Sequence, residues 1–179
     1  INKEAHSRVP VFQKSLDDVV GMVHIKDVVA ERQSNKSFNL EDIVRPVLFV
    51  APSMHVLELS AGGGWYTEIL APYLKEKGQL SVTHHNPQAG GYYKRSRDSF
   101  DAKVASNPLF EGVNVLTADV PPTQAYIQPN SQDLVLTFRN LHNWLSRDAM
   151  QAVMQEAYNA LKDGGHFGVV EHRAPENSS

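Results

Sequence analysis

The chain has 179 residues, 41% of them hydrophobic and 21% charged, which suffices for one domain of ordinary size and disfavours disorder over most of its length. Seventeen Lys and Arg stand against twenty Asp and Glu, and this formal net charge of −3 disfavours a nucleic-acid binder. The absence of cysteine excludes disulfides and thiolate metal sites, and the longest apolar stretch, residues 46–52, is far shorter than the roughly 20 residues that span a bilayer. We therefore expect neither nucleic acid nor membrane among its partners.

Short strands and short helices are predicted for the first third of the chain. The predicted elements are strands over residues 8–12, 19–25 and 47–50, a helix over residues 26–33 and a helical turn over residues 40–44. Pro10 confines the first strand to a sheet edge, and Pro46 ends the helical turn because the residue before a proline is pushed out of the helical region. The chain begins at Ile1 with neither Met nor an apolar signal core, so we expect an excised or processed piece.

Longer strands and helices alternate from residue 55 onward. Apolar runs predict strands over residues 55–59, 79–83, 113–118, 133–138 and 166–171. Helical spacing places several apolar residues on one face of a first helix, namely Tyr66, Ile69, Leu70, Tyr73 and Leu74. A second helix covers residues 94–105 with Phe100 and Val104 inward, and Ser146 can cap a third helix that ends at Gly164. This alternation predicts an α/β fold, a Rossmann-like three-layer sandwich with a parallel sheet.

A glycine cluster lies between the first of these strands and the first helix, in the sequence Glu58-Leu59-Ser60-Ala61-Gly62-Gly63-Gly64. Glycines permit a tight turn and let a ligand approach main-chain N–H groups without interference from a Cβ atom. The third glycine of a G-x-G-x-x-G pattern is missing, since Thr67 stands there, and the Gly-Lys-Ser/Thr of a phosphate loop is missing as well. We expect a bound ligand at this turn, the alternative being a strand-to-helix turn with convenient glycines.

The turn resembles motif I of the class I S-adenosylmethionine-dependent methyltransferases, in which an acidic residue, here Glu58, precedes a G-x-G, here Gly62 and Gly64. Further segments resemble the same family, at residues 115–119, 133–136 and 160–165. Residues 138–144 and 170–174 resemble a bacterial subgroup of predicted methyltransferases. The resemblance covers residues 55–174 and implies S-adenosylmethionine as the cofactor, with the turn against the amino-acid part of this methyl donor.

The resemblance implies a set of donor-binding residues, which are Glu58, Ala61, Gly62, Gly64, Asn86, Asp119 and Arg139. The family usually carries an acidic residue for the ribose hydroxyls after the second strand, where this chain reads Thr83-His84-His85-Asn86. An amide hydrogen-bonds a ribose less strongly than a carboxylate does, and Asn86 is the candidate for that contact. The familiar fold has seven strands, so we expect a fold truncated after its fifth strand.

Candidate catalytic residues follow the fourth and fifth predicted strands and are His142, Glu171 and His172. The carboxyl ends of parallel strands are where ligands of open α/β folds collect, so we expect these residues in the same cleft as Gly62, as general base and anchor for a small-molecule acceptor. A polar strand terminus without function is the alternative. The eight histidines show no metal-ligand spacing, and no metal site is expected.

Residues 5–57 resemble a different family, the paired CBS domains of CorC-like transporter-associated proteins, on segments 5–12, 16–27 and 45–54. In that family the residue at the position of Asp27 commonly contacts an adenosine ribose, but we favour a helix N-cap for it here. The resemblance begins inside one CBS motif and stops where the second would begin. We therefore predict a partial CBS-like α+β segment at residues 1–54 before a truncated methyltransferase-like domain at residues 55–179, joined as a chimera.

The expected function is S-adenosylmethionine-dependent methyl transfer to a small-molecule acceptor, or an inactive relative of such an enzyme if truncation has removed turnover. The alternative is a nonenzymatic module of CBS type that binds an adenosine nucleotide, or an engineered chimeric fold without activity. Exposed sheet edges predict a homodimer, because neither partial fold closes its own core.

Overall fold

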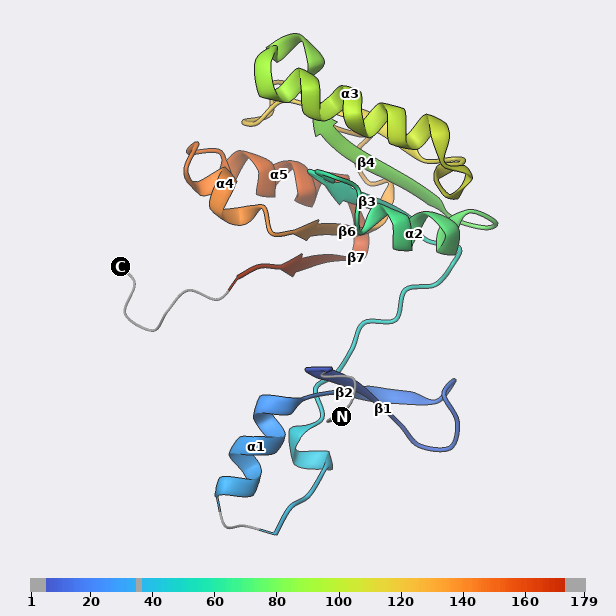
Figure 1. The fold of residues 1–179 in the computed structure, drawn as a ribbon, viewed down its shortest axis with the longest axis vertical. Helices are drawn as coiled ribbons and strands as arrows, with labels where there is room; N and C mark the ends of the chain where they lie inside the picture. Colours follow the sequence, from blue (N-terminus) through green and yellow to red (C-terminus); the bar gives the residue numbers. More distant parts are fainter. Residues whose placement is uncertain (1–5, 35–36, 173–179) are drawn as a thin grey trace. The chain divides into compact units, whose positions relative to one another are not determined.

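The structure, a computed structural model, describes residues 6–34 and 37–172. The chain divides into two compact units, Ile1–Val50 and Ala51–Ser179 (Figure 1). Within the described residues, every helix is too short or too polar to cross a membrane.

The first unit is a small antiparallel hairpin with a helix. Strand β1 (Arg8–Phe12) pairs with β2 (Val19–His24), and helix α1 (Ile25–Gln33) and a 3-10 turn, η1 (Glu41–Ile43), follow. Met22 and Arg45 exchange two backbone hydrogen bonds of 2.9 and 2.8 Å. Pro46 has no N–H group to continue this pairing, so the strand predicted over residues 47–50 is wrong.

Asp27 does not cap α1. The N-cap is His24, whose imidazole accepts the Lys26 N–H at 3.1 Å. The Asp27 carboxylate instead accepts hydrogen bonds of 2.8 Å from Nε and Nη2 of Arg45, and this Arg45 hydrogen bond lowers the pKa of Asp27. The N-cap interpretation is therefore wrong, and Arg45 occupies both carboxylate oxygens.

The second unit contains a parallel sheet of order β5-β4-β3-β6-β7. Its strands are β3 (His55–Leu59), β4 (Gln79–His85), β5 (Asn114–Ala118), β6 (Gln132–Phe138) and β7 (Leu161–Val170). Its helices are α2 (Thr67–Leu74), α3 (Gly91–Ser106), α4 (Leu141–Leu145) and α5 (Met150–Ala160), with 3-10 turns η2 (Pro87–Ala89) and η3 (Pro108–Phe110). The chain moves outward from β3 to β5 and then returns to the other side of β3, so the strand order reverses between β3 and β6.

Apolar side chains cover both faces of this sheet. Leu57 and Leu59 of β3 belong to the core cluster that packs on α5, while Phe100 of α3 is buried on the other face and contacts His84 of β4. Figure 1 shows the sheet with its helices. The predicted α/β, Rossmann-like three-layer sandwich is confirmed, and β3 lies at its centre.

Helix α2 buries a face that is rotated from the predicted one. Leu74 is buried as predicted, but Ile69 and Tyr73 are 60% and 48% exposed, and Thr67 and Ala71 are buried in addition. The phase of the helix is fixed at its first residue, because the Thr67 hydroxyl donates to the buried Glu58 carboxylate at 2.7 Å. The apolar spacing of the sequence gives no sign of this hydrogen bond between Thr67 and Glu58.

The helices and strand after β6 also differ from the prediction. Ser146 ends the short helix α4, which was not predicted, and its Oγ donates to the Asn143 carbonyl at 3.0 Å. The N-cap of α5 is Ala149, so the capping role of Ser146 is wrong. Helix α5 ends at Ala160 rather than at Gly164, and β7 begins at the next residue.

Candidate functional site

The glycine turn after β3 is held from β4. Ser60 donates its N–H to Thr83 Oγ1 at 2.8 Å, and Ala61 donates its N–H to the Thr83 carbonyl at 3.0 Å. Ser60, Gly62 and Gly64 have φ values of 56°, 57° and 76°, which lie in the left-handed region. The end of β4 thus fixes the turn in a conformation that glycine adopts most readily.

The glycines of the turn differ in what surrounds them. A Cβ atom on Gly64 would lie 2.7 Å from the Phe100 ring, so the core beneath the turn requires glycine. A Cβ atom on Gly63 would meet nothing within 4 Å, and one on Gly62 only the Ser60 carbonyl at 3.9 Å. The open side of Gly62 and Gly63 leaves room for a ligand against the main chain.

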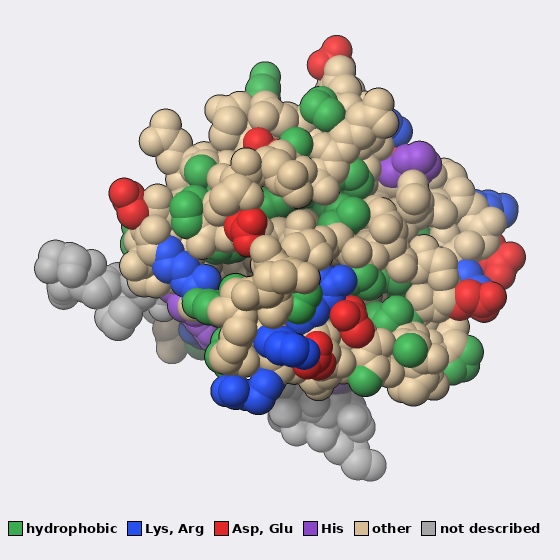
Figure 2. All heavy atoms as spheres, turned by 90° about the horizontal axis from the view of Figure 1, so that it is seen from above, with side chains coloured by type: hydrophobic (Ala, Val, Ile, Leu, Met, Phe, Trp, Pro, Cys, Tyr) green, Lys and Arg blue, Asp and Glu red, His purple; other side chains and the backbone are tan. Residues whose placement is uncertain are grey.

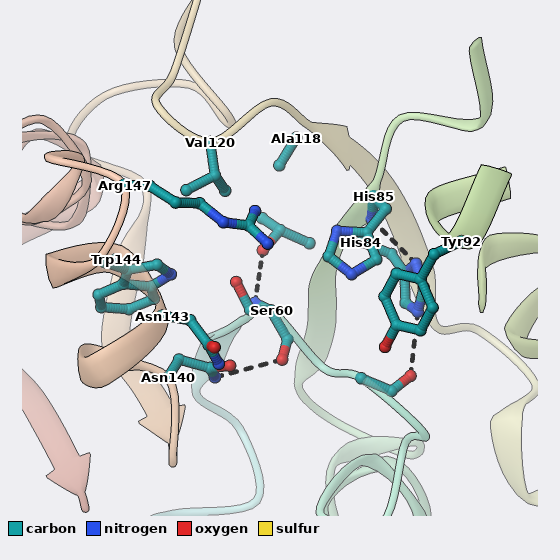
Figure 3. A pocket seen from close by; sticks show the side chains of 12 residues that line it. Ser60, His84, His85, Tyr92, Ala118, Val120, Asn140, Asn143, Trp144 and Arg147 are labelled. Atoms are coloured by element: carbon teal, nitrogen blue, oxygen red, sulfur yellow. Dashed lines mark hydrogen bonds between the residues drawn. The ribbon is translucent and has the colours of Figure 1, made fainter. Parts of the chain in front are cut away.

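A cavity of about 190 Å³ opens beside this turn, where the strand order reverses between β3 and β6 (Figure 3). Its lining residues lie at or just after the carboxyl ends of the strands, in α3, and in or just after α4. They are Ser60, Gly62, Thr83, His84, His85, Tyr92, Ala118, Val120, Asn140, Asn143, Trp144 and Arg147. Ala118, Val120 and Trp144 form an apolar wall, whereas the amides of Asn140 and Asn143 are polar. An apolar wall with a few polar groups is typical of small-molecule sites.

His84 connects the cavity wall to the turn. Its Nδ1 accepts the His85 N–H at 2.9 Å, so Nε2 carries the ring proton and donates to the Gly62 carbonyl at 3.0 Å. Burial lowers the pKa of His84, which is 3% exposed. The imidazole is therefore a neutral donor that positions Gly62.

Asn140 joins the ends of β3 and β6 beneath the cavity. Its Nδ2 lies 3.2 Å from the Leu59 carbonyl, 3.3 Å from the Ser60 carbonyl and 3.1 Å from Thr137 Oγ1. The amide thus fixes the relative position of the glycine turn and α4.

The predicted donor-binding residues separate into two groups. Gly62 lines the cavity, Ala61 and Gly64 complete the turn, and Glu58 lies buried below it. The other predicted residues, Asn86, Asp119 and Arg139, are not among the residues that line the cavity.

Asn86 and Asp119 bind each other. Asn86 Nδ2 donates to Asp119 Oδ1 at 3.1 Å, and Thr123 Oγ1 donates to Asp119 Oδ2 at 2.8 Å. The hydrogen bonds from Thr123 and Asn86 lower the pKa of Asp119. Both side chains support the loop whose residues Ala118 and Val120 face the cavity.

The predicted catalytic residues lie together at the carboxyl ends of β6 and β7. His142 Nδ1 is 3.3 Å from both Glu171 carboxylate oxygens, and these oxygens also accept the N–H groups of Leu141 and His172 at 2.8 Å. Burial raises the pKa of Glu171, but the hydrogen bonds from His172, Leu141 and His142 outweigh it, and the pKa lies below its ordinary value. Arg139 belongs to this cluster, since its Nε lies 2.8 Å from His172 Nε2.

His142 and Glu171 are not among the residues that line the cavity containing Gly62, so the expectation of one shared cleft stays a prediction. The two sites are adjacent through α4, because Asn143 of this helix lines the cavity while His142 contacts Glu171. The side chain of His142 is 57% exposed and can be reached from solvent.

Several site residues were missed from the sequence, namely Thr83, His84, Asn140, Asn143 and Arg147. Thr83 and His84 belong to the segment in which the family usually carries an acidic residue. Asn140 and Asn143 belong to the segment 138–144 that resembles the methyltransferase subgroup, and this resemblance was the available signal.

Comparison with known proteins finds partial similarity to two kinds of protein. Its UPF0053 relative, protein sll0260 of Synechocystis, is 41% identical over 68 residues, which are 36% of this chain and 15% of that protein. This partial match confirms the resemblance to CorC-like proteins and supports a chimera. The highly reducing polyketide synthase verA of Penicillium polonicum is 26% identical over 156 residues, which are 87% of this chain and 6% of that protein. The chain thus spans only a small part of either relative.

The second unit has its own matches. A crystal structure of a SAM-dependent methyltransferase from Aquifex aeolicus has the same fold, with a TM-score of 0.56 and 16% identity over 71% of this chain and 61% of that chain. Residues 57–169, more than half of the chain, match the sequence model of the family described as "Methyltransferase domain". The chain therefore belongs to the methyltransferase domain family.

Proposed function

We propose that the unit Ala51–Ser179 binds S-adenosylmethionine in the cavity beside Gly62 and transfers the donor's methyl group to a small-molecule acceptor. The observation that carries the proposal is the open glycine turn at the point where the strand order reverses. A ligand at that point can approach the main chain on the side where Gly62 and Gly63 carry no Cβ atom.

The residues of the cavity fit this donor. A Cβ atom on Gly62 or Gly63 would occupy the space where the ligand must approach the main chain. Ala118, Val120 and Trp144 offer an apolar wall suited to an adenine ring, and Asn143 offers an amide for hydrogen bonds. The bound donor supplies a methyl group on a sulfonium that is already activated for transfer. Positioning by these residues therefore provides most of the rate enhancement.

The cluster of His142 and Glu171 suits the acceptor side. An acceptor O–H or N–H group must lose its proton when it is methylated. The exposed imidazole of His142 accepts this proton, and Glu171, held ionised by the N–H groups of Leu141 and His172, orients the ring and balances its positive charge.

A small molecule is a better acceptor than a nucleic acid for this chain. The formal net charge is −3, and on the face seen in Figure 2 the Lys and Arg side chains lie among Asp and Glu side chains. A nucleic-acid site needs a continuous basic surface.

Calorimetric titration with S-adenosylhomocysteine, the demethylated product, tests the donor site. We expect binding to the unaltered chain and its loss in Gly62→Val, because the valine side chain fills the open side of the turn. Gly112→Val also places a branched side chain at a glycine of positive φ, but outside the cavity lining, and serves as the control. No binding to the unaltered chain would refute the donor site.

Transfer of a labelled methyl group to a panel of phenols, amines and carboxylic acids tests the acceptor side. His142→Asn should lose transfer and keep S-adenosylhomocysteine binding, because a group that acts on the acceptor contributes to the transition state and little to donor affinity. His166→Asn removes an exposed histidine of β7 and should leave transfer unchanged. Equal transfer by both variants would remove His142 from the mechanism.

The nucleotide-binding alternative has no comparable support. The carboxylate of Asp27, which would contact a ribose, is held on both oxygens by Arg45. An adenosine ligand would have to displace this ion pair.

A further inference from the structure

The charges that face the cavity are of one sign. Among its lining residues, all of which are described, Arg147, His84 and His85 are the groups that can carry positive charge, and neither aspartate nor glutamate is present. The two histidines are neutral near pH 7, because burial lowers the pKa of each of them and Arg147 lowers that of His85 further. Arg147 is therefore the fixed charge of this cavity wall.

The Arg147 guanidinium has no anionic partner among the described residues. Arg45 and Arg97 pair with Asp27 and Asp101 at 2.8 Å, whereas no hydrogen bond or ion pair involves the Arg147 side chain. Its contact is with the Tyr93 ring, whose centroid lies 5.4 Å from Cζ. A cation held over an aromatic face keeps its N–H donors available.

The position of Arg147 directs these donors inward. The residue follows α4, and Figure 3 shows its side chain extending into the cavity between Val120 and Ser60. A planar guanidinium presents parallel N–H groups that match the two oxygens of a carboxylate. A cavity with such a cation and no competing acid selects an anionic group.

We propose that Arg147 anchors a carboxylate in this cavity, an inference that rests on the proposed function in so far as the cavity is the donor site. The carboxylate belongs either to the amino-acid part of the methyl donor or to the acceptor. Both sources present the same chemistry to the guanidinium, and they are distinguished by ligands that lack only this group.

Calorimetry with paired ligands separates the two sources. If the carboxylate is the donor's, S-adenosylhomocysteine binds about tenfold or more tightly than its decarboxylated analogue, since a hydrogen-bonded charge pair contributes on that scale. Arg147→Gln should then remove the difference, and Arg147→Lys should retain part of it. If the carboxylate is the acceptor's, the two adenosine ligands bind alike, and benzoate but not benzamide binds the protein saturated with S-adenosylhomocysteine. Arg147→Gln should abolish that benzoate binding.

Arg32→Gln is the matched control. Arg32 also lies over an aromatic ring, that of Phe38 at 5.7 Å, but does not line the cavity. The proposal is overturned if Arg147→Gln changes neither the preference for S-adenosylhomocysteine over its decarboxylated analogue nor the preference for benzoate over benzamide. It is also overturned if Arg32→Gln produces the same change. Benzoate and benzamide are also titrated into the free protein. If S-adenosylhomocysteine does not bind, the donor site is refuted, and the benzoate titration still tests whether Arg147 binds a carboxylate. Absence of any Arg147-dependent binding overturns the anchor.

Discussion

Replacement of Glu58 by glutamine should stabilise the protein in a manner that depends on pH. Glu58 is 2% exposed, and burial raises its pKa from 4.5 to about 7, although the hydrogen bond from Thr67 partly opposes the shift. The folded state therefore holds the proton more tightly than the unfolded chain does. The free energy of unfolding then falls as pH rises from about 4.5 to about 7, and levels off above that range.

The size of the effect follows from the two pKa values. At about 1.4 kcal/mol for each pH unit between them, ionisation of the buried carboxyl costs about 3 kcal/mol of stability at pH 8. The amide of Glu58→Gln cannot ionise, and its oxygen still accepts the Thr67 hydroxyl. The variant should thus be as stable as the parent near pH 4 and more stable by up to about 3 kcal/mol at pH 8.

Urea unfolding of both proteins between pH 4 and pH 8.5 measures this difference. All other titrating groups are common to the two proteins, so the difference in unfolding free energy isolates Glu58. Glu76→Gln, which removes an exposed carboxylate just after α2, is the control and should change the unfolding free energy little. A flat difference for Glu58→Gln would show that the carboxyl is not desolvated in the folded state, and would refute the argument.

Three further predictions concern the sheet and the turn. Gly64→Ala should destabilise the protein by about 1–3 kcal/mol in thermal unfolding, because of the positive φ and the nearby Phe100 ring, whereas Gly63→Ala should have little effect. Asp133→Asn should cost about 1 kcal/mol at pH 7, since Asp133 accepts hydrogen bonds from His55 and Lys162 that lower its pKa, and the cost should shrink below pH 4 in acid titration. We also propose a homodimer through the edge strands β5 or β7; a sedimentation coefficient that does not change with concentration and matches a monomer would contradict it.

The sheet could be predicted from the sequence because strand signals are local. Apolar runs bounded by turn residues mark all five strands of the parallel sheet, and the family resemblance gave their connection. The exposure of Ile69 and Tyr73 on α2 could not be predicted from such runs, because the hydrogen bond from Thr67 to a buried carboxylate rotates the helix away from its apolar spacing.

The candidate site was predictable only at the strand ends. His142, Glu171 and His172 follow parallel strands that are neighbours in the sheet, and the structure brings them together at one edge. Arg147 follows a five-residue helix that has no clear sequence pattern, so its approach to the cavity depends on tertiary packing. The place of Asn86 after β4 predicts a ribose contact, but its amide donates to Asp119.

The placement of the two sites in the sheet implies that they differ in their resistance to local unfolding. The glycine turn of the proposed donor cavity follows β3 and is held from β4 by three hydrogen bonds, and both strands are paired on both sides, whereas Ala118 of the cavity wall ends the edge strand β5. The proposed acceptor cluster of His142 and Glu171 depends on Glu171, which follows β7, a strand paired on one side only. Local opening begins where pairing is least complete, so loosening of β7 should separate Glu171 from His142 while the turn stays fixed. Donor binding should therefore persist under mild denaturant that already reduces methyl transfer.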